Sequence, residues 1–362
     1  MKYILHIIAQ LRIGGAEKVA RDIELYAPEG YENHYVVFGN EVGEYEEQII
    51  EHGCKVFHMQ LPSESYLKFI KNLKQLMTET KYNVVHAHTM FNIGWVMLAA
   101  KQMGVPIRIA HAHSALNNGS GVIKNVYETV MRRMILECST DLVGCGEDAG
   151  KRLFGEKEFE KRGKLILNGI DTIQFAFNSE TREKVRSELE VSDKFVIGHA
   201  GHLAEVKNQR FLINMMPELL KKKPNAVLVL LGEGEDRIML ENKISELGLN
   251  GKVIMTGNVP NVYDYLCAMD VFAFPSLFEG MPLSVVEVQA NGLPCVISNR
   301  VPNDVFITDL LTPRSIDNAE PWIGAICSAA RSNPEKYADI IKESGFDIRT
   351  VIKSFYEIYE RS

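Results

Sequence analysis

The sequence predicts an α/β protein made of two Rossmann-like domains, each built around a parallel sheet. The chain has 362 residues, and a single hydrophobic core usually stops growing at roughly 250–300 residues, so two domains are expected. Short apolar runs alternate with helical periods along the chain, which is typical of βαβ units. The composition, with 46% hydrophobic and 24% charged residues, is that of an ordinary globular protein.

The expected elements follow one another in a regular order. In the first half we expect strands at 4–9, 35–38, 56–59, 84–88, 107–113, 142–144 and 165–167, with helices at 16–26 and 44–52. The second half repeats the rhythm with a helix at 179–189 and strands at 195–198, 227–231, 253–255, 271–274 and 294–297. An apolar-periodic helix is expected at 348–359. The boundary is placed near residue 175, which gives domains at 1–175 and 176–345 and a C-terminal segment at 346–362.

Charge and cysteine usage narrow the class of protein. The net charge of −7 and the pI near 5.9 give no overall attraction to nucleic acid or to an anionic membrane, so any membrane contact must be local. Polar residues at Gln10, Arg12 and Glu17 follow the apolar N-terminus too soon for a signal peptide or membrane anchor. Six cysteines show no zinc-ligand spacing, and reduced thiols in the cytoplasm fit best.

The first candidate site is the Gly-Gly-Ala-Glu segment at 14–17, directly after the first expected strand. Missing side chains there let a phosphate approach the backbone at the start of a helix, although such a turn is structural about as often. No third glycine follows, and the residues near position 35 supply no acidic partner for a ribose. Both absences argue against a nicotinamide-dependent dehydrogenase.

The stronger signal is a pair of glutamates, Glu279 and Glu287, that flank an expected helix start. Pro282 suits a first helical turn, so Glu279 would lie in the preceding loop and Glu287 on the second turn. Between them, Leu283 and Ser284 would present backbone N–H groups. This arrangement fits a ligand in which a sugar, a diphosphate and a ribose follow one another.

A third segment, at 201–208, follows the strand that begins at 195 and contains Lys207, a compact cation that can neutralise a diphosphate. Together with the glutamate pair, it resembles the retaining glycosyltransferases of family 4. The likeness covers nearly the whole chain, including 14–17 and 168–171. It implies the GT-B fold, in which two Rossmann-like domains face each other across a cleft and a C-terminal helix returns to the first domain.

The resemblance implies roles for individual residues. Glu279 contacts hydroxyls of the donor sugar, Glu287 holds the ribose, and Lys207 stabilises the departing diphosphate together with the N–H groups of Gly15 and Leu283. The implied donor-binding set is completed by His202, Gly232, Asn261, Met281 and Ser284. The implied catalytic set is Glu279, His113 and Lys207.

Histidines close two of the expected first-domain strands. His111 and His113 share one face of their strand because side chains alternate every two residues. Polar residues that simply finish a strand are an equally good explanation. By resemblance, His113 approaches the donor sugar, and His86, His88 and His111 line the acceptor side.

One position departs from the family pattern, because the family usually has arginine where His202 stands. An unperturbed histidine has a pKa of about 6.5 and is only partly charged at neutral pH, which would weaken diphosphate stabilisation. We hypothesise that bound diphosphate recruits the protonated form of His202. Unchanged donor affinity and turnover of His202→Ala at both pH 6 and pH 8 would contradict this.

The resemblance implies a retaining, metal-independent transfer from a nucleotide-sugar, with UDP favoured over GDP, and no cofactor. The sequence contains no Asp-x-Asp motif, which argues against the metal-clamped alternative fold. The acceptor would be a glycan or a polyprenyl-diphosphate-linked sugar in bacterial surface polysaccharide synthesis. A sugar-nucleotide epimerase or hydrolase of the same plan, or a non-catalytic nucleotide-sugar sensor, stays as the alternative.

Two first-domain segments have amphipathic patterns. In 65–77, three lysines are expected opposite the apolar residues Leu67, Phe69, Ile70 and Leu73. The segment 122–136 carries Lys124, Arg132 and Arg133. Most such helices pack on a sheet. The alternative is peripheral docking on the anionic inner face of the cell membrane, where a lipid-linked acceptor would reside.

Overall fold

The computed structural model describes residues 1–12, 14–114 and 121–361. The chain forms two compact units, one of Met1–Gly169 with Ile348–Ser362 and one of Ile170–Asp347. The first division therefore lies a few residues before the expected position near 175. The second lies two residues after the expected end of the second domain at 345.

Hydrogen bonds at the crossing segments explain this difference. The backbone N–H of Ile170 donates to the carbonyl of Phe346 at 2.8 Å. The hydroxyl of Thr172 donates to a carboxylate oxygen of Asp347 at 2.6 Å, and both side chains are buried. Because these partners belong to the second unit, residues 170–175 fold with it and not with the first.

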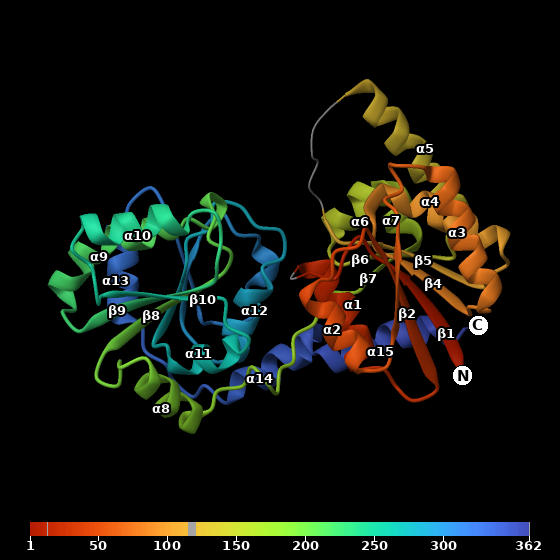
Figure 1. The fold of residues 1–362 in the computed structure, drawn as a ribbon. Helices are drawn as coiled ribbons and strands as arrows, with labels where there is room; N and C mark the ends of the chain where they lie inside the picture. Colours follow the sequence, from red (N-terminus) through yellow and green to blue (C-terminus); the bar gives the residue numbers. More distant parts are fainter. Residues whose placement is uncertain (13, 115–120, 362) are drawn as a thin grey trace. The chain divides into compact units, whose positions relative to one another are not determined.

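The first unit contains a seven-stranded parallel sheet with the order β3-β2-β1-β4-β5-β6-β7 (Figure 1). Its strands are β1 (Lys2–Ile7), β2 (Tyr31–Phe38), β3 (Lys55–Met59), β4 (Val84–Ala87), β5 (Ile107–Ala112), β6 (Asp141–Gly144) and β7 (Gly163–Leu165). The strand expected at 165–167 is shifted. At this edge of the sheet Lys164 and Leu165 are exposed, so an apolar run did not mark the strand.

Helices cover both faces of this sheet. They are α1 (Gly15–Leu25), α2 (Glu44–Glu51), α3 (Tyr66–Glu79), α4 (Ile93–Gln102), α5 (Val122–Cys138), α6 (Glu147–Phe154), α7 (Glu156–Arg162) and α15 (Ile348–Tyr359), with a 3₁₀ turn η1 (Met90–Asn92). Helices α3 to α6 pack against the face that carries Leu5 and Ile7. Helices α1 and α15 cover the opposite face, which carries Ile4 and Val84.

Helix α15 occupies the residues expected for it, and its apolar stripe is buried in the first unit. Figure 1 shows this blue helix beside the red strands of the N-terminus. The expectation that the C-terminal helix returns to the first domain is therefore confirmed.

The two amphipathic segments form α3 and α5, but their polar faces differ from the expected ones. Leu67 is 85% exposed and lies on the same side of α3 as Lys71, because residues four apart share a face. In α5, Arg132 donates to the carbonyl of Leu153 at 3.0 Å, and Lys124 and Arg133 pair with glutamates of the same helix. The expected basic face of α5 is thus taken up by internal partners.

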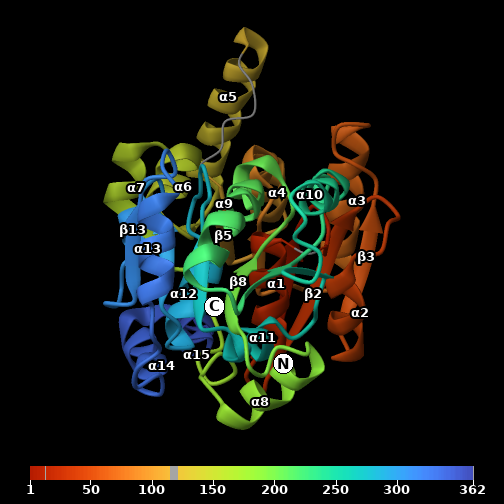
Figure 2. The same cartoon turned by 90° about the vertical axis from the view of Figure 1, so that its left-hand side faces the viewer.

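The second unit contains a six-stranded parallel sheet with the order β10-β9-β8-β11-β12-β13. Figure 2 shows this unit in front. Its strands are β8 (Phe195–Ala200), β9 (Ala226–Leu231), β10 (Val253–Gly257), β11 (Val271–Phe274), β12 (Cys295–Ser298) and β13 (Leu311–Arg314). Strand β13 was not predicted. It is a short edge strand that contains Pro313, and proline lowers the strand signal of a sequence.

The helices of the second unit are α8 (Ser179–Glu188), α9 (Gln209–Lys222), α10 (Arg237–Glu246), α11 (Val262–Ala268), α12 (Leu283–Ala290), α13 (Glu320–Ser328) and α14 (Lys336–Ile341). Short turns are η2 (Glu205–Lys207), η3 (Asn303–Val305) and the π-helical η4 (Lys342–Phe346). Helices α9, α10 and α13 form the core on one face of the sheet. Across the described residues of both units, no helix is long and apolar enough to span a bilayer.

Each sheet has one place where the strand order reverses. The first strand of each unit lies inside its sheet, β1 between β2 and β4, and β8 between β9 and β11. In open α/β sheets, ligands bind at the carboxyl ends of the strands beside such a switch point. Ligand sites are therefore expected at the loops after β1 and β4 and at those after β8 and β11.

Candidate active site

At the switch point of the second unit, a lysine and a glutamate meet. Lys207 ends η2 after β8, Glu279 lies in the loop between β11 and α12, and their charged groups are 2.6 Å apart. The two side chains are only 22% and 11% exposed. The Lys207 ammonium also lies 5.4 Å from the ring centre of Phe274. Two of the predicted catalytic residues are therefore brought together.

Hydrogen bonds tie the loops that carry this pair to each other. The N–H of Leu277 donates to the carbonyl of Val206 at 2.8 Å, and the Asn208 side chain donates to the carbonyl of Pro275 at 3.3 Å. Asn208 has a left-handed backbone with φ of +57°, which asparagine tolerates better than most residues. These contacts hold Lys207 and Glu279 at a defined separation.

A buried histidine supports the same loops from beneath. His199 Nδ1 donates to the carbonyl of Ala273 at 2.9 Å, so its Nε2 accepts from the Gln209 amide at 3.2 Å. Burial lowers the pKa of His199 to about 4. The ring is therefore neutral and links β8, β11 and the start of α9.

Helix α12 presents its N-terminus next to Glu279. It begins at Leu283, one residue later than expected, because Pro282 has an extended ψ of 95° and takes the N-cap position. Glu287 lies on the second turn, as predicted, and is half-buried, as are Met281 and Ser284. Two carboxylates therefore flank a helix N-terminus, which favours anions through its free N–H groups.

Two other predicted donor-binding residues have structural explanations. A side chain at Gly232 would place its Cβ 2.1 Å from the carbonyl oxygen of Gly201, so only glycine fits. Asn261 lies at the start of α11 and donates from its side chain to Asp264 at 2.6 Å. Their proposed contacts with a nucleotide stay predictions.

His202 lies on the surface and pairs with Glu235, with 2.7 Å between Nε2 and the carboxylate; the side chains are 63% and 67% exposed. A cavity of about 300 Å³ lies beside this region and is lined by Glu205, Asn208, Gln209, Arg210, Asp236, Met239 and Leu277. Its lining includes none of the predicted donor-binding residues. The effect of histidine at position 202 stays a hypothesis.

In the first unit, Gly14 and Gly15 follow β1 at its switch point. A Cβ at Gly14 would lie 2.3 Å from the Glu17 carboxylate, whose pKa is raised by burial. A Cβ at Gly15 would meet nothing within 4 Å. Packing therefore does not require glycine at position 15. The open space leaves room for the predicted approach of a phosphate.

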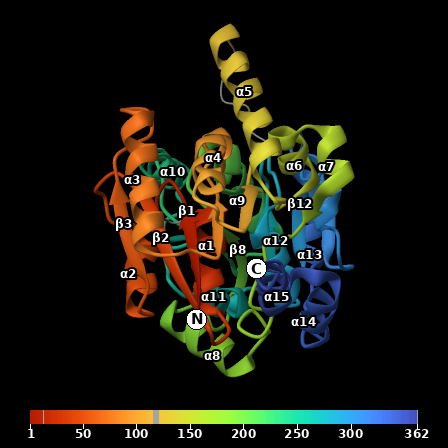
Figure 3. The ribbon, with the colours of Figure 1, turned by 90° about the vertical axis from the view of Figure 1, so that its right-hand side faces the viewer.

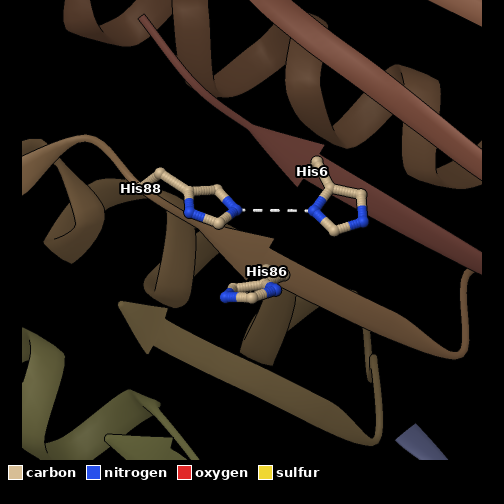
Figure 4. Close-up of side chains that lie close together, drawn as sticks. All are labelled: His6, His86 and His88. Atoms are coloured by element: carbon tan, nitrogen blue, oxygen red, sulfur yellow. Dashed lines mark hydrogen bonds between the residues drawn. The ribbon is translucent and has the colours of Figure 1, made fainter. Parts of the chain in front are cut away.

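Five histidines gather at the carboxyl ends of β1, β4 and β5. They are His6, His86, His88, His111 and His113, and the rings of His111 and His113 are centred 3.9 Å apart. Figure 4 shows that His6 comes from one strand and His86 and His88 from its neighbour. His6 was not predicted. Only the parallel pairing of β1 with β4, which aligns His6 with His86, reveals it.

These rings bond to one another. His88 Nδ1 lies 2.8 Å from His113 Nε2, and His86 Nε2 lies 3.1 Å from His111 Nδ1. Burial lowers the pKa of His6 to about 4 and of His113 to about 3. Burial and neighbouring rings also hold the pKa of the other three well below the usual value. The cluster is therefore uncharged at neutral pH.

Two trios in this cluster have the size of a metal site. Ring nitrogens of His6, His86 and His88, and of His88, His111 and His113, lie within 4.8 Å of one another. Hydrogen bonds already occupy most of these nitrogens. Among the described residues, the buried histidine nitrogens without a partner are His111 Nε2 and His113 Nδ1. The arrangement is that of a hydrogen-bonded network.

The fold matches solved structures over its full length. The Anabaena protein Alr3699/HepE, solved in complex with UDP, superposes with a TM-score of 0.79, covers 100% of both chains and is 19% identical. Two Rossmann-like units with a returning C-terminal helix are the features of the GT-B fold.

Sequence comparison gives the family. Residues 13–174 match the model of glycosyltransferase family 4, and residues 180–343 match that of glycosyl transferases group 1. EpsF of Bacillus subtilis strain 168 is 30% identical over 100% of this chain and 97% of its own. EpsF is named as a glycosyltransferase. The chain therefore belongs to the family of glycosyltransferases that includes EpsF.

Two further relatives are named for polysaccharide synthesis or for transfer to a lipid-linked sugar. A capsular polysaccharide biosynthesis glycosyltransferase of Staphylococcus aureus, CapH, is 25% identical over 98% of each chain. An Escherichia coli UDP-Gal:α-D-GlcNAc-diphosphoundecaprenol α-1,3-galactosyltransferase is 28% identical over 67% of this chain and 64% of its own. These findings favour a transferase over the epimerase, hydrolase and sensor alternatives.

Proposed function

We propose that this glycosyltransferase moves a hexose from a UDP-sugar to a glycan or polyprenyl-diphosphate-linked acceptor, with retention of configuration and without a metal ion or cofactor. The observation that carries the proposal is the Lys207–Glu279 pair beside the N-terminus of α12. The second unit would bind the nucleotide-sugar, and the first unit the acceptor.

Glycosyl transfer is favoured by fixed positive groups around the departing diphosphate. As the bond from the anomeric carbon to the phosphate oxygen breaks, negative charge grows on the diphosphate, and preorganised donors there lower the barrier most. The proposal gives this role to Lys207 and the N–H of Leu283, and gives Glu279 the role of holding sugar hydroxyls. The acceptor oxygen then bonds to the anomeric carbon on the same face, and its proton passes to the leaving phosphate oxygen. From the first unit, the proposal assigns Gly15 to the diphosphate and His113 to the sugar.

The relatives support the substrate class. HepE was solved with UDP, and the Escherichia coli relative is named for a UDP-sugar donor and an undecaprenol-diphosphate acceptor. CapH is named for capsular polysaccharide synthesis. We extend these to this chain as a role in bacterial surface polysaccharide synthesis.

The test is a panel of UDP-, GDP- and ADP-sugars, assayed for thermal stabilisation and for transfer to lipid-diphosphate-linked sugars, with and without EDTA. We expect stabilisation and turnover with a UDP-sugar, no loss in EDTA, and a product whose anomeric proton coupling matches that of the donor. An inverted product, or turnover that requires a divalent metal, would overturn the corresponding part of the proposal.

The proposal includes peripheral contact with an anionic membrane on the cytoplasmic side. Figure 3 shows α5 extending beyond the other helices of the first unit. Its outer turns expose Val122, Ile123 and Val126 by 80%, 88% and 58%. On α3, Lys68 and Lys71 are exposed beside Leu67. Apolar residues for insertion and lysines for anionic headgroups are the combination that interfacial helices use.

Co-sedimentation with liposomes tests this contact. We expect binding to vesicles containing phosphatidylglycerol, and loss of binding in Ile123→Asp with Val126→Asp. Glu137→Asp, a change on the same helix away from the apolar turns, should bind as the parent does. Equal binding of the doubly substituted protein would rule out α5 as the contact.

A further inference from the structure

The histidine network in the first unit starts at an amide whose orientation is fixed. The Asn33 nitrogen donates to a carboxylate oxygen of Glu24 at 2.8 Å and to the hydroxyl of Tyr356 at 3.1 Å. A carboxylate only accepts, and the Tyr356 hydroxyl already donates to the carbonyl of Ile23. Both neighbours therefore require the nitrogen on their side. The Asn33 oxygen must then face His6 Nε2, 3.1 Å away.

This orientation sets the direction of each following hydrogen bond. An amide oxygen only accepts, so His6 Nε2 carries the hydrogen and His6 Nδ1 is a bare lone pair. His88 Nε2, 3.4 Å from that lone pair, is then the donor (Figure 4). The remaining lone pair, on His88 Nδ1, accepts from His113 Nε2 at 2.8 Å.

Each ring in this chain of hydrogen bonds carries a single hydrogen. Two rings joined by one hydrogen bond cannot both present N–H groups to it, and each ring of this chain bonds to the next. The low pKa values that burial gives His6 and His113 agree with this. His113 is therefore held with a hydrogen on Nε2 and a bare lone pair on Nδ1.

That lone pair is buried and has no partner among the described residues. A buried acceptor left unpaired is unfavourable, so the position is suited to a group that brings a hydrogen. Sugar hydroxyls bring one, whereas carboxylate and phosphate oxygens at neutral pH only accept.

We propose that Asn33, His6 and His88 are positioning residues that hold His113 in the tautomer whose Nδ1 accepts a hydrogen bond from a hydroxyl of the sugar substrate. The place of His113 beside the sugar rests on the proposed function. The tautomer rests only on the first unit. The chain of bonds thereby makes this position selective for a hydroxyl over an anionic group.

A metal ion is the competing occupant. Binding by His88, His111 and His113 would require His88 to release His6 or His113, because both of its ring nitrogens are already bonded. The network gives no anionic ligand to offset the charge of a dication in a site whose burial disfavours cations. A metal bound to His113 would overturn the proposal.

Nitrogen-15 NMR of histidine-labelled protein tests the tautomer directly. The His113 signals are identified by their loss in His113→Gln. We expect a protonated Nε2 and a bare Nδ1, unchanged by EDTA. A hydrogen on Nδ1, or a signal that EDTA shifts together with stoichiometric metal in the purified protein, would overturn the proposal. The tautomer itself is read on the unsubstituted protein, and His113→Gln serves only to assign the signals.

Kinetics test the positioning role. His88→Phe keeps an aromatic ring but removes both bonds, so we expect the His113 signal to change and kcat/KM to fall about tenfold, the size of one net hydrogen bond. His88→Gln keeps one acceptor and one donor and should restore both readouts. His34→Phe is the matched control, since His34 is buried in the same unit but bonds to Tyr82 and Glu32.

The outcomes separate the two proposals. An unchanged His113 tautomer in His88→Phe would end the positioning role while the proposed function stood. Absence of transfer by the unsubstituted enzyme would end the proposed function, whatever the nitrogen spectra showed.

Discussion

The Glu279 carboxylate pairs with the ammonium of Lys207, so the two residues have opposite effects on an anionic ligand. Without the carboxylate, Lys207 is free to meet a diphosphate, but the sugar loses its partner. We therefore expect Glu279→Gln to lower kcat by roughly 10²–10³-fold, comparable with loss of one transition-state contact, while UDP binding stays equal or tightens. Turnover assays and titration calorimetry with UDP check this.

Glu205→Gln is the matched control, because Glu205 is an exposed carboxylate two residues from Lys207. It should leave kcat unchanged. If Glu279→Gln weakened UDP binding as strongly as it lowered turnover, the carboxylate would have a structural role instead of a role in positioning the sugar.

The contribution of His202 to donor binding is expected to depend on pH. Its ring lies on the surface against Glu235 and carries a charge only when protonated. The hypothesis that bound diphosphate recruits the protonated ring makes the contribution of His202 depend on pH. We expect His202→Ala to weaken donor binding severalfold at pH 6 and little at pH 8. His202→Arg should bind the donor equally at both pH values, and calorimetry at each pH decides the matter.

At the scale of elements, α15 shows how a distant segment completes the first unit. Phe355 is fully buried and lies against the rings of His86 and His111, with centroids 5.4 and 5.3 Å away. The helix therefore covers the histidine network as well as the sheet.

We expect Phe355→Ala to destabilise the first unit by about 3–5 kcal/mol, the usual effect of removing a buried phenylalanine ring. Lys353→Ala, at an exposed position of the same helix, should change stability by less than about 0.5 kcal/mol. Urea unfolding followed by the fluorescence of Trp95 in a Trp322→Phe background measures this unit. Equal stability of the two variants would show that α15 does not contribute to it.

Across the whole molecule, the buried neutral histidines are unevenly divided. In the first unit the pKa is lowered at five histidines, and in the second at His199. An unfolded histidine binds a proton below about pH 6.5 and these folded ones do not, so the unfolded state takes up more protons as the pH falls. The free energy of unfolding then falls as the pH drops below about 6.5. Each of these histidines contributes a loss of about 1.4 kcal/mol for each pH unit.

We therefore expect the first unit to lose more stability than the second between pH 7.5 and pH 5.5. His58 acts in the opposite direction, because its hydrogen bonds and the charge of Glu46 outweigh desolvation and raise its pKa, but it is one residue against five. Each unit has one tryptophan, so urea unfolding of Trp322→Phe reports the first unit and that of Trp95→Phe the second. Equal losses in both would contradict the assignment of neutral rings.

The sequence by itself determined the two α/β units, most of their strands and the segments that carry the site. These features depend on local periodicity and turn chemistry, which neighbouring residues encode. It misplaced β7 and missed β13, because edge strands lack a continuous apolar run.

Only the tertiary structure decided which loops share a switch point. Pairing of β8 with β11 brings Lys207 to Glu279 across 72 positions of the chain, and pairing of β1 with β4 brings His6 to His88 across 82. Strand order depends on packing between distant segments, and no local pattern in the chain records it. The same holds for the tautomer of His113, since Asn33 and Glu24 set it from other elements.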